Sequence, residues 1–566
     1  MSQEEVAPVL VAGAGPAGLT LALILAKSGV PVRIINKASS FHKEQRGLGL
    51  QPRTQEIFHF LGVLPEMRTL GIDLQPLKFY KFPGGKEVLT TLHLVMPEDP
   101  TPSRPFNNPI QVPQHHTEAV LRSHLAKYGC SVELNTELIA LERFDDHVEV
   151  TVKKTVDGEE VLETKSYRWL IGADGGRSVV RKQSGLSFEG ESSPEKAVLG
   201  EVYLDELDPY HWHMWLKYTD GPPTNLLIRA TEVKGKFWFM LSGNVDPEKI
   251  LESDESVKEA LRLASERDDL PLGEIVHKTD YRPSVRMVNK FREGRVFVAG
   301  DAAHVHTPRG GQGVNSSVQD AFNLGWKIAL VEKGLASPSL LDTYSEERFP
   351  VITQMLQETV NMTKDVFTQM RDPESLKSAW QRGTHLKQFG INYRWSSIIF
   401  DERFKSIDSA GAEAGALNAY GSDGDALRAG DRAPDATGVV RIGGKETGPQ
   451  PTSLFATFSP THHTVLIFGA DAAATGPVVQ RLKTYPPGTV FSATVHPGAS
   501  SIVLEAAGGA DVVLQDRDGV AYAEYGMSEG QPFVVIVRPD GFVGAGTSGE
   551  EGVRKYFDAI FSAVAT

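Results

Sequence analysis

A glycine-rich turn near the start of the chain has the residue types and spacing of a phosphate cradle. It comprises Gly13, Ala14, Gly15, Pro16, Ala17 and Gly18, and it stands between a short apolar run and a stretch of good helix formers. In such a strand-to-helix turn, the first glycine permits the tight turn, the second lets the backbone approach a pyrophosphate, and the third lets helix and strand pack. The helix N-terminus adds N–H groups and a positive dipole end. The turn therefore predicts a dinucleotide site.

A second match to this spacing, Gly544 to Gly549, is expected to be a loop. Only one helix follows it in the sequence, which is too little to complete a βαβ unit. The context of the glycines, and not their spacing alone, therefore favours the first turn.

A second glycine-rich segment lies almost three hundred residues further on. The apolar run Arg295 to Ala299 predicts a strand that returns to the first module and delivers Asp301, and a glycine run from Gly310 to Asn315 follows. Residues 316–332 then have the apolar periodicity of a helix, which Gly334 ends.

Other polar residues occupy positions next to predicted elements. Asn36 and Lys37 follow the predicted strand 30–35, where an acidic residue usually binds the ribose hydroxyls of a dinucleotide. Arg46 lies in a glycine-flanked loop, and Gln114 begins a predicted helix that ends near residue 129.

Composition limits the classes of function. The 566 residues predict roughly three or four domains. The net charge of −14, without a dense basic block, argues against a nucleic-acid partner. Cys130 is the single cysteine, so we expect no internal disulfide, no redox pair and no cysteine metal site. No signal peptide or membrane helix is expected, and the protein is expected to be cytoplasmic, with no metal.

The pattern along the chain predicts an α/β protein with a Rossmann-like domain, an interleaved antiparallel sheet and a separate C-terminal α/β domain. We expect the first domain over 1–184, with 75–110 contributing to the sheet domain at 185–285. The first domain returns over 286–400 with a helical segment, a Gly/Ala/Ser/Asp-rich linker covers 401–429, and the last domain covers 430–566.

Together these motifs resemble the single-component FAD-dependent aromatic hydroxylases. The resemblance rests on Gly13 to Gly18, on Arg46 with Gln51 and Arg53, on Gln114, on Asp174-Gly175 with Arg177, and on Gly300 through Asn315. The C-terminal region looks like the thioredoxin-like tail of the phenol hydroxylase branch. That tail has no cysteine pair, so thiol chemistry is not expected of it, and the resemblance implies dimerisation or lid support instead.

The resemblance implies a set of cofactor contacts. Asp301 is expected to bind the ribityl hydroxyls of FAD, and Asp174 to bridge FAD and NAD(P)H, with NADPH favoured over NADH. The backbone from Gly310 to Asn315 is expected to bring N–H groups to the pyrimidine side of the flavin, where negative charge develops on reduction. The predicted cofactor-binding residues are the six of the first turn together with Asn36, Lys37, Arg46, Gln51, Gln114, Asp174, Asp301, Gly311, Gly313, Val314 and Asn315.

The resemblance also implies the reaction. A phenolic aromatic substrate would be hydroxylated with NAD(P)H and O2 through a flavin C4a-hydroperoxide, by a homodimer. Arg46 and Pro308 are the leading candidates for shaping the catalytic site, and His213, Tyr218 and Trp238 are weaker ones. The chain departs from phenol hydroxylases at Leu48 and over Lys236-Phe237-Trp238, so the substrate and its activating base stay open.

Three alternatives remain open from the sequence. Oxidative decarboxylation of a 4-hydroxybenzoate would use the same chemistry. A flavin oxidoreductase that inserts no oxygen is disfavoured because a redox cysteine pair and a second core GxGxxG are missing. A non-enzymatic flavin-fold carrier would have no need of the N–H groups between Gly310 and Asn315.

Overall fold

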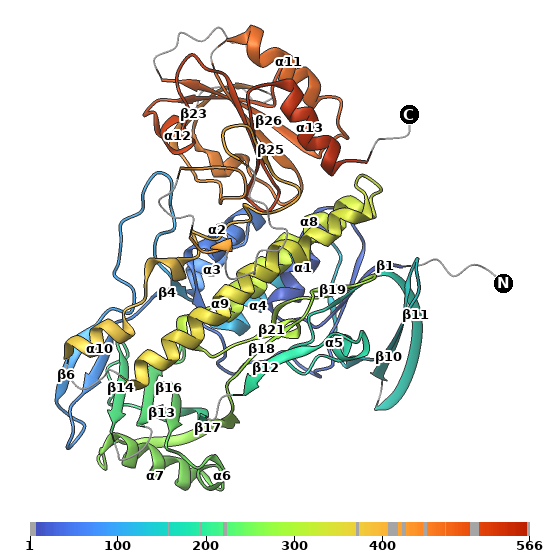
Figure 1. Cartoon of the computed structure of the whole chain (residues 1–566). Helices are drawn as coiled ribbons and strands as arrows, with labels where there is room; N and C mark the ends of the chain where they lie inside the picture. The colour runs from blue at the N-terminus through green and yellow to red at the C-terminus, as the bar shows by residue number, and fades with distance from the viewer. Residues whose placement is uncertain are drawn as a thin grey trace.

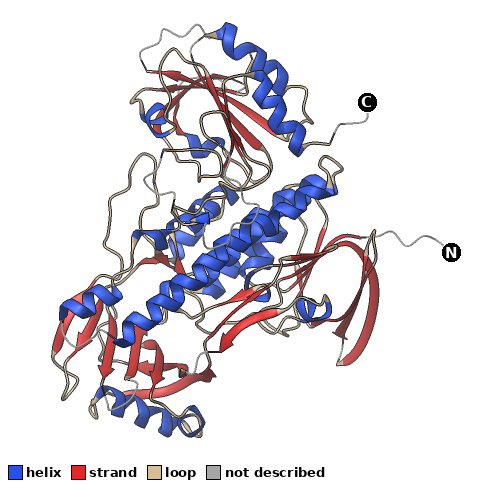
Figure 2. Ribbon diagram, in the orientation of Figure 1, coloured by secondary structure: helices blue, strands red, loops and turns tan. Residues whose placement is uncertain are grey.

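The computed structural model describes residues 7–156, 158–192, 195–218, 223–368, 373–405, 417–421, 426–444, 450–469, 471–498 and 509–562. The long helices lie in the middle of the molecule and sheets surround them (Figure 2). We call the three large sheets the N-terminal, middle and C-terminal sheets. Among the described residues, no helix combines the length and the apolar character needed to cross a membrane.

The N-terminal sheet carries the first glycine turn. Its main path is β19-β20-β11-β1-β2-β8, in which the strands from β20 to β8 pair in parallel and β19 is antiparallel to β20. Strands β10 and β9 extend the sheet from β11 in antiparallel pairs. The strands are β1 (Ala7–Ala12), β2 (Val32–Ile35), β8 (Val132–Glu133), β9 (Thr136–Arg143), β10 (Val148–Val156), β11 (Glu159–Gly172), β19 (Arg292–Glu293) and β20 (Val296–Val298). The pairing of β20 with β11 shows that the chain returns to this sheet, as the sequence predicts.

Helices cover this sheet and connect it to the rest of the molecule. They are α1 (Pro16–Lys27), α2 (Pro52–Leu61), α3 (Leu64–Leu70), α4 (Gln114–Ala126), α5 (Val179–Gln183), α8 (Gly313–Glu332), α9 (Thr343–Thr368) and α10 (Pro373–Trp380). Short 3-10 turns are η1 (Gly300–Ala302), η2 (Arg309–Gly311), η3 (Pro338–Asp342) and η4 (Thr384–Lys387). The apolar helix α1 packs on α4 and α8. Helix α8 begins three residues before the predicted start at Ser316, so its first turn belongs to the glycine loop.

The middle sheet contains most of the predicted antiparallel segment. Its order is β17-β13-β16-β15-β14-β5-β6, and β5 joins β14 in parallel. The strands are β5 (Leu77–Tyr80), β6 (Val88–Leu92), β13 (Lys196–Leu204), β14 (Trp212–Lys217), β15 (Thr224–Ala230), β16 (Lys236–Gly243) and β17 (Leu272–Tyr281). Residues 77–79 of β5 therefore pair with residues 212–214 of β14, which are far away in sequence (Figure 1). Helices α6 (Pro247–Ile250) and α7 (Asp254–Ser265) follow β16.

Two small sheets connect these parts. One has the order β12-β18-β21, with β12 (Phe188–Ser192), β18 (Ser284–Val288) and β21 (His304–Val305). The other has the order β3-β7-β4, with β3 (Gly49–Leu50), β4 (Ile72–Asp73) and β7 (Ile110–Gln111). Segment 188–192, expected in the antiparallel sheet, therefore pairs outside the middle sheet.

The C-terminal sheet has the order β22-β29-β28-β25-β26-β27-β23-β24. Within it, β25 and β26 are parallel, and β28 is antiparallel to β25 and β29. Helix α11 lies between β25 and β26 in the chain and α13 follows β29, so this part of the chain is an α/β unit, and its likeness to thioredoxin stays a prediction. The elements are β22 (Phe400–Asp401), β23 (Thr437–Gly444), β24 (Gln450–Ser453), η6 (Leu454–Thr457), β25 (His463–Phe468), α11 (Ala472–Leu482), β26 (Val490–Pro497), β27 (Val512–Asp516), α12 (Val520–Glu524), β28 (Phe533–Val537), β29 (Val543–Thr547) and α13 (Glu550–Ile560). The sequence predicts a loop at the second glycine-spacing match, and this is wrong for Gly544 to Thr547, which lie within strand β29.

The described part of the segment expected to be a linker is packed. Ala419, Tyr420 and Ala429 are buried, and Asp401 accepts a hydrogen bond from the backbone of Ala429. Residues 406–416 and 422–425 lie outside the described residues. The domain limits drawn from the sequence remain predictions.

Candidate functional site

The first glycine turn has the geometry that a close phosphate contact requires. Gly13 has φ +109°, and a Cβ there would lie 2.1 Å from the carbonyl oxygen of Ala173. A Cβ on Gly18 would lie 2.0 Å from the carbonyl oxygen of Gly13. A Cβ on Gly15 would meet nothing within 4 Å, so this part of the turn faces open space. Gly15 caps α1 without any side-chain hydrogen bond, which leaves the helix N-terminus available to an anion.

Asp301 is an exposed residue whose carboxyl group has a shifted pKa. Its side chain is accessible to solvent, yet burial among surrounding atoms raises its pKa, with His304 and Arg46 opposing this shift. Within the described part of the chain, its carboxylate makes no hydrogen bond, so its oxygens are free to accept from hydroxyls of a ligand. The influence of Arg46 shows that the charges of both predicted site residues act in the same region.

A buried polar cluster holds the loop that presents Asp301. Asp320 of α8 accepts hydrogen bonds from the backbone N–H of Gly300 (3.0 Å) and from Arg348 (2.8 Å), and it lies 2.7 Å from the ring of His304. Although burial raises the pKa of Asp320, His304 and Arg348 hold it below its ordinary value. Asp320 therefore stays charged and fixes the strand end that carries Asp301.

The second glycine run is tied to the Arg46 segment by Asn315. The Asn315 amide oxygen accepts from the backbone N–H of Gln51 at 2.8 Å, and its amide nitrogen donates to the carbonyls of Gly49 and Gly311. Gln51 also donates to the carbonyl of Gly310. The side chains of Gln51 and Asn315 thus join two loops, while the backbone at Gly313 and Val314 begins α8 without a side-chain cap. That backbone is the part of the run that can donate to a ligand.

The loop around Arg46 is held from both sides. Gln114 accepts from the backbone N–H of Gly47 at 3.3 Å and donates to Glu118 at 2.9 Å. Gln45 donates its backbone N–H to buried Glu201 of β13 at 2.7 Å and its side-chain amide to Glu232. Arg46 itself is exposed, and its guanidinium lies 3.3 Å from the ring nitrogen Nδ1 of His42. Gln114 and Gln45 therefore position the loop and leave the Arg46 guanidinium accessible.

Three other predicted cofactor contacts have local roles. Asn36 follows β2 and accepts from the backbone N–H of Ala38, and Lys37 is exposed. Asp174 accepts hydrogen bonds from Ser178 and from the backbone N–H groups of Val179 and Val180, so its carboxylate caps the start of α5. A cofactor contact by these side chains stays a prediction.

Arg181 and Arg177 differ in their surroundings. Arg181 is buried and donates to the carbonyls of Ala302 and Gly176, which connects the Asp174 turn to the Asp301 turn. Arg177 is exposed. Of the two, only Arg181 therefore has a structural role in the described contacts.

The weaker catalytic candidates lie on different faces of the middle sheet. Trp238 packs with Met240 and Trp212 on the face that also contacts Leu376 and Trp380 of α10. Buried His213 bonds to Tyr80 and to the carbonyl of Asp208, and burial lowers its pKa to about 4. His213 stacks with Trp215, which belongs to the core facing α7, so it points away from the glycine loops. This places His213 among structural residues.

Tyr218 and Pro308 are both exposed. Tyr218 follows the end of β14, and Pro308 precedes η2, where its carbonyl accepts from the N–H of Gly311 at 3.2 Å. Pro308 thus shapes the glycine turn through its carbonyl.

The structure adds residues that the sequence did not single out. Arg382 lies beside Gly311. Burial, together with the negative charges of Asp301 and Glu195, raises the pKa of Tyr281 to about 12, which places Tyr281 near Asp301. His115, His116 and Glu232 place their ligand atoms within 4.8 Å of one another beside the Gln45 contact. None of these residues stands in a recognisable motif, and each meets its neighbours only through the tertiary fold.

A cavity of about 260 Å³ lies elsewhere, between the end of α8 and the C-terminal domain. Its lining includes Trp326, Lys333, His463 and Pro487. None of its lining residues belongs to the glycine loops. We place the functional site at the glycine loops, because they contain the open space at Gly15 and the Asp301 carboxylate, which makes no hydrogen bond with the described residues.

These observations fit FAD. The open space at Gly15 suits a pyrophosphate, the unbonded carboxylate of Asp301 suits sugar hydroxyls, and the uncapped start of α8 suits an electron-rich ring edge.

Comparison with known proteins agrees with this geometry. The sequence matches the FAD binding domain family over residues 6–359 and the phenol hydroxylase C-terminal dimerisation domain over residues 506–564. A flavin-dependent monooxygenase of Mycobacteroides abscessus is 34% identical over 561 residues, which cover 98% of this chain and 99% of that protein. Pentachlorophenol 4-monooxygenase of Sphingobium chlorophenolicum is 32% identical over 450 residues, 78% of each chain.

Solved structures share the fold over the whole chain. The flavin-dependent monooxygenase PieE, in complex with FAD and substrate, gives a TM-score of 0.76 at 22% identity and covers 98% of this chain and 100% of its own. Aklavinone-11 hydroxylase, in a ternary complex with FAD and aklavinone, gives 0.76 at 24% identity and covers 99% of each chain.

Proposed function

The chain belongs to the FAD-dependent aromatic monooxygenases, and we propose that within this family it uses NAD(P)H and O2 to hydroxylate a phenolic aromatic substrate. Membership confirms the resemblance, the fold class and the enzyme class that the sequence motifs indicate. A relative named for a chlorinated phenol supports a phenolic substrate.

Bound FAD would supply the activation of O2 and the transfer of one oxygen atom to the ring. The chain's own residues bind and orient. The turn from Gly13 to Gly18 would hold the pyrophosphate, Asp301 would accept from the ribityl hydroxyls, and the first N–H groups of α8 would face the pyrimidine edge. Arg46 would add a fixed positive charge from an accessible loop.

The substrate is proposed to lie against the apolar face of the middle sheet. Trp238 and Met240 are half-buried on this face, which suits a ring with polar substituents and excludes water from it. The observation that carries the proposal is the environment of Asp301. Its carboxylate is accessible and accepts no hydrogen bond from the described residues, while Asp320 of α8 holds the adjacent Gly300 in place. A simple scaffold would gain nothing from leaving this carboxylate without a hydrogen bond from the described part of the chain.

NAD(P)H is proposed to dock briefly, with NADPH favoured over NADH. The second glycine-spacing match lies at β29 in the C-terminal sheet, where a Cβ on Gly544 would meet the Tyr556 hydroxyl at 2.3 Å. Gly544 lies within this strand and its space is filled by the Tyr556 side chain, so the segment does not offer a second nucleotide cradle.

We further propose a homodimer formed through the C-terminal domain, because residues 506–564 match a dimerisation domain. Size-exclusion chromatography with light scattering of the full chain should give two chains per particle. A single chain per particle at all working concentrations would contradict this.

A panel of phenols tests the main proposal. The purified flavoprotein should oxidise NADPH faster with a suitable phenol, and ¹⁸O from labelled O2 should enter the product. A 4-hydroxybenzoate in the panel, with CO2 detection, separates simple hydroxylation from oxidative decarboxylation. NADPH oxidation that no aromatic stimulates, with no label in any product, would indicate a flavin reductase instead.

A further inference from the structure

Arg382 connects the middle sheet to the glycine loop. It follows α10, and its backbone N–H donates to the carbonyl of Leu94 at 2.7 Å. Trp380, two residues earlier, packs edge to face on Phe79 of β5 with ring centroids 5.5 Å apart. These contacts fix the backbone of Arg382 at the edge of the middle sheet.

The Arg382 side chain extends to the glycine loop. A Cβ built on Gly311 would lie 3.8 Å from Nη1 of Arg382 and 3.8 Å from Nε2 of Gln51. Gly311 has φ +63° and belongs to the run whose backbone leads into α8. The guanidinium therefore lies where the apolar face of the middle sheet meets this loop.

Arg382 carries a positive charge that no described residue neutralises. Its residue is only partly accessible, and burial lowers its pKa to about 10 with no carboxylate opposing the shift. Other buried arginines have acids, as Arg348 has Asp320 and Arg538 has Glu347. Among the described residues, the Arg382 guanidinium makes no hydrogen bond or ion pair. A desolvated cation with five free N–H donors is costly unless an anion completes it.

We propose that Arg382 binds an anionic oxygen of the aromatic substrate, a phenolate or a ring carboxylate, while the ring lies on the apolar face that includes Trp238 and Met240. This inference rests on the proposed function and specifies its substrate class. The planar guanidinium can bind such an oxygen with two donors, and its charge favours the ionised form of a phenol. An ionised phenol is the better nucleophile, so the same contact would promote hydroxylation.

The local chemistry supports an aromatic anion over a neutral ring. Trp380, Phe79 and Leu94 make the wall next to Arg382 apolar, so charge there is weakly screened. Gly311 leaves space opposite the guanidinium that a side chain would reduce. Glu98, four residues after Leu94, is paired with Lys387 at 2.7 Å.

Binding of simple probes to the FAD-loaded enzyme tests the assignment without turnover. The probes are 4-nitrophenol, whose absorbance reports its ionisation, benzoate, 4-hydroxybenzoate and neutral benzyl alcohol. The variants are Arg382→Met, which removes the charge, and Arg382→Lys, which keeps it but loses the planar fork. Arg554→Met on α13, where an exposed pair with Glu551 is lost, is the matched control. Flavin content and the unfolding midpoint establish that each variant is folded.

We expect the wild type and Arg554→Met to lower the pKa of bound 4-nitrophenol relative to the free probe. Arg382→Met should abolish this shift and weaken binding of the anionic probes by about tenfold or more, with Arg382→Lys between them. A loss restricted to 4-nitrophenol identifies a phenolate as the anion, and a loss restricted to benzoate identifies a carboxylate.

Three results would overturn the assignment. They are binding of every anionic probe by Arg382→Met within twofold of wild type, failure of every anionic probe to bind wild type, and a loss confined to the KM for NADPH. An enzyme that binds ionised 4-nitrophenol through Arg382 but transfers no labelled oxygen to any phenol would refute the proposed function and leave the anion site standing.

Discussion

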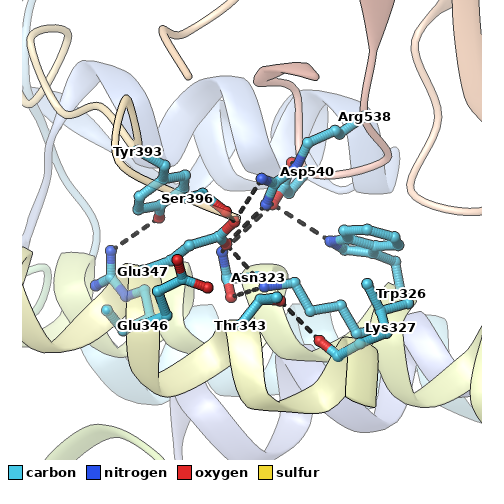
Figure 3. Close-up of polar contacts among 12 residues, drawn as sticks. Asn323, Trp326, Lys327, Thr343, Glu346, Glu347, Tyr393, Ser396, Arg538 and Asp540 are labelled. Carbon is cyan, nitrogen blue, oxygen red and sulfur yellow. Dashed lines mark hydrogen bonds and ion pairs between the residues drawn. The ribbon is translucent and has the colours of Figure 1, made fainter. Parts of the chain in front are cut away.

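The guanidinium of Arg538 lies 2.6 Å from the carboxylate of Glu347, and both side chains are fully buried. Glu347 belongs to α9, and Arg538 follows β28, so the pair joins the C-terminal domain to the FAD-binding part of the chain. Lys327 also bonds to Glu347, and Asp540 accepts from Arg538 and Trp326 (Figure 3). The interface is therefore built on charges that compensate one another.

Breaking this pair should destabilise the protein strongly. Arg538→Met leaves Glu347 with only Lys327 as a cationic partner, and loss of one member of a buried pair typically costs about 3–5 kcal/mol. Urea unfolding followed by tryptophan fluorescence measures the loss. Arg554→Met, at an exposed pair on α13, should change stability little. Equal losses of unfolding free energy in the two variants would show that the buried pair stabilises the protein no more than the exposed pair does.

The same network predicts a loss of stability in acid. Burial alone would raise the pKa of Glu347, but the charges of Arg538 and Lys327 hold it well below its ordinary value. A depressed carboxyl pKa stabilises the folded state above the unfolded pKa, near 4.5, and this contribution disappears as pH falls towards the folded value. The contribution of Glu347 to the free energy of unfolding should thus be constant near neutral pH, and it should decrease below about pH 4.5. Arg538→Met should flatten that fall.

The local motifs of the site could be predicted from sequence, and the contacts between distant segments could not. The turn from Gly13 to Gly18 is specified by neighbouring residues, so its glycines indicate its geometry directly. Asp301 could be placed because the strand before it and the helix after it are both strongly patterned. Arg382 stands in an irregular segment, and its position over Gly311 depends on the packing of α10 on β5 and β6.

For Asp174, the sequence contained a local signal for the contact that the structure shows. The resemblance implies a cofactor bridge, which stays a prediction, and in the structure the Asp174 carboxylate caps α5 together with Ser178. A serine just before a short helix is a local capping signal that the sequence did contain. His213 was one of several polar residues in an aromatic strand, and only the sheet register places it on the face towards α7, because a shift of one residue would exchange the two faces.

Removal of the Asp301 carboxylate should weaken FAD binding. Asp301→Ala deletes the charged acceptor proposed for the ribityl hydroxyls, and we expect the dissociation constant of FAD to rise by about tenfold or more. The wild type should hold one non-covalent FAD per chain. Flavin released by ultrafiltration measures the change, and exposed Asp145→Ala is the control. Full flavin retention in Asp301→Ala would contradict the proposed contact.

Replacement of Arg46 by lysine should affect coupling more than folding. Arg46 is accessible in a loop whose position depends on Gln45 and Gln114, so the substitution disturbs few internal contacts. Lysine keeps the charge but loses the planar fork, and we expect about a twofold or larger rise in the fraction of NAD(P)H oxidised to peroxide. Product formed per NAD(P)H consumed is the measurement, with Arg143→Lys as a surface control. Unchanged coupling would remove Arg46 from the proposed site.

The aromatic substrate should control flavin reduction. If a phenol must occupy the space between the apolar face near Trp238 and the glycine loop before NADPH acts, reduction without it should be slow, which protects NADPH from waste. Rapid mixing with NADPH under anaerobic conditions should show slow bleaching of the flavin alone and at least about tenfold faster bleaching with an accepted phenol. Turnover should also require a ring hydroxyl and rise with pH through the pKa of the bound phenol, because the ionised ring is the nucleophile. Fast reduction with no aromatic present would mean that substrate binding and reduction are not linked in this enzyme.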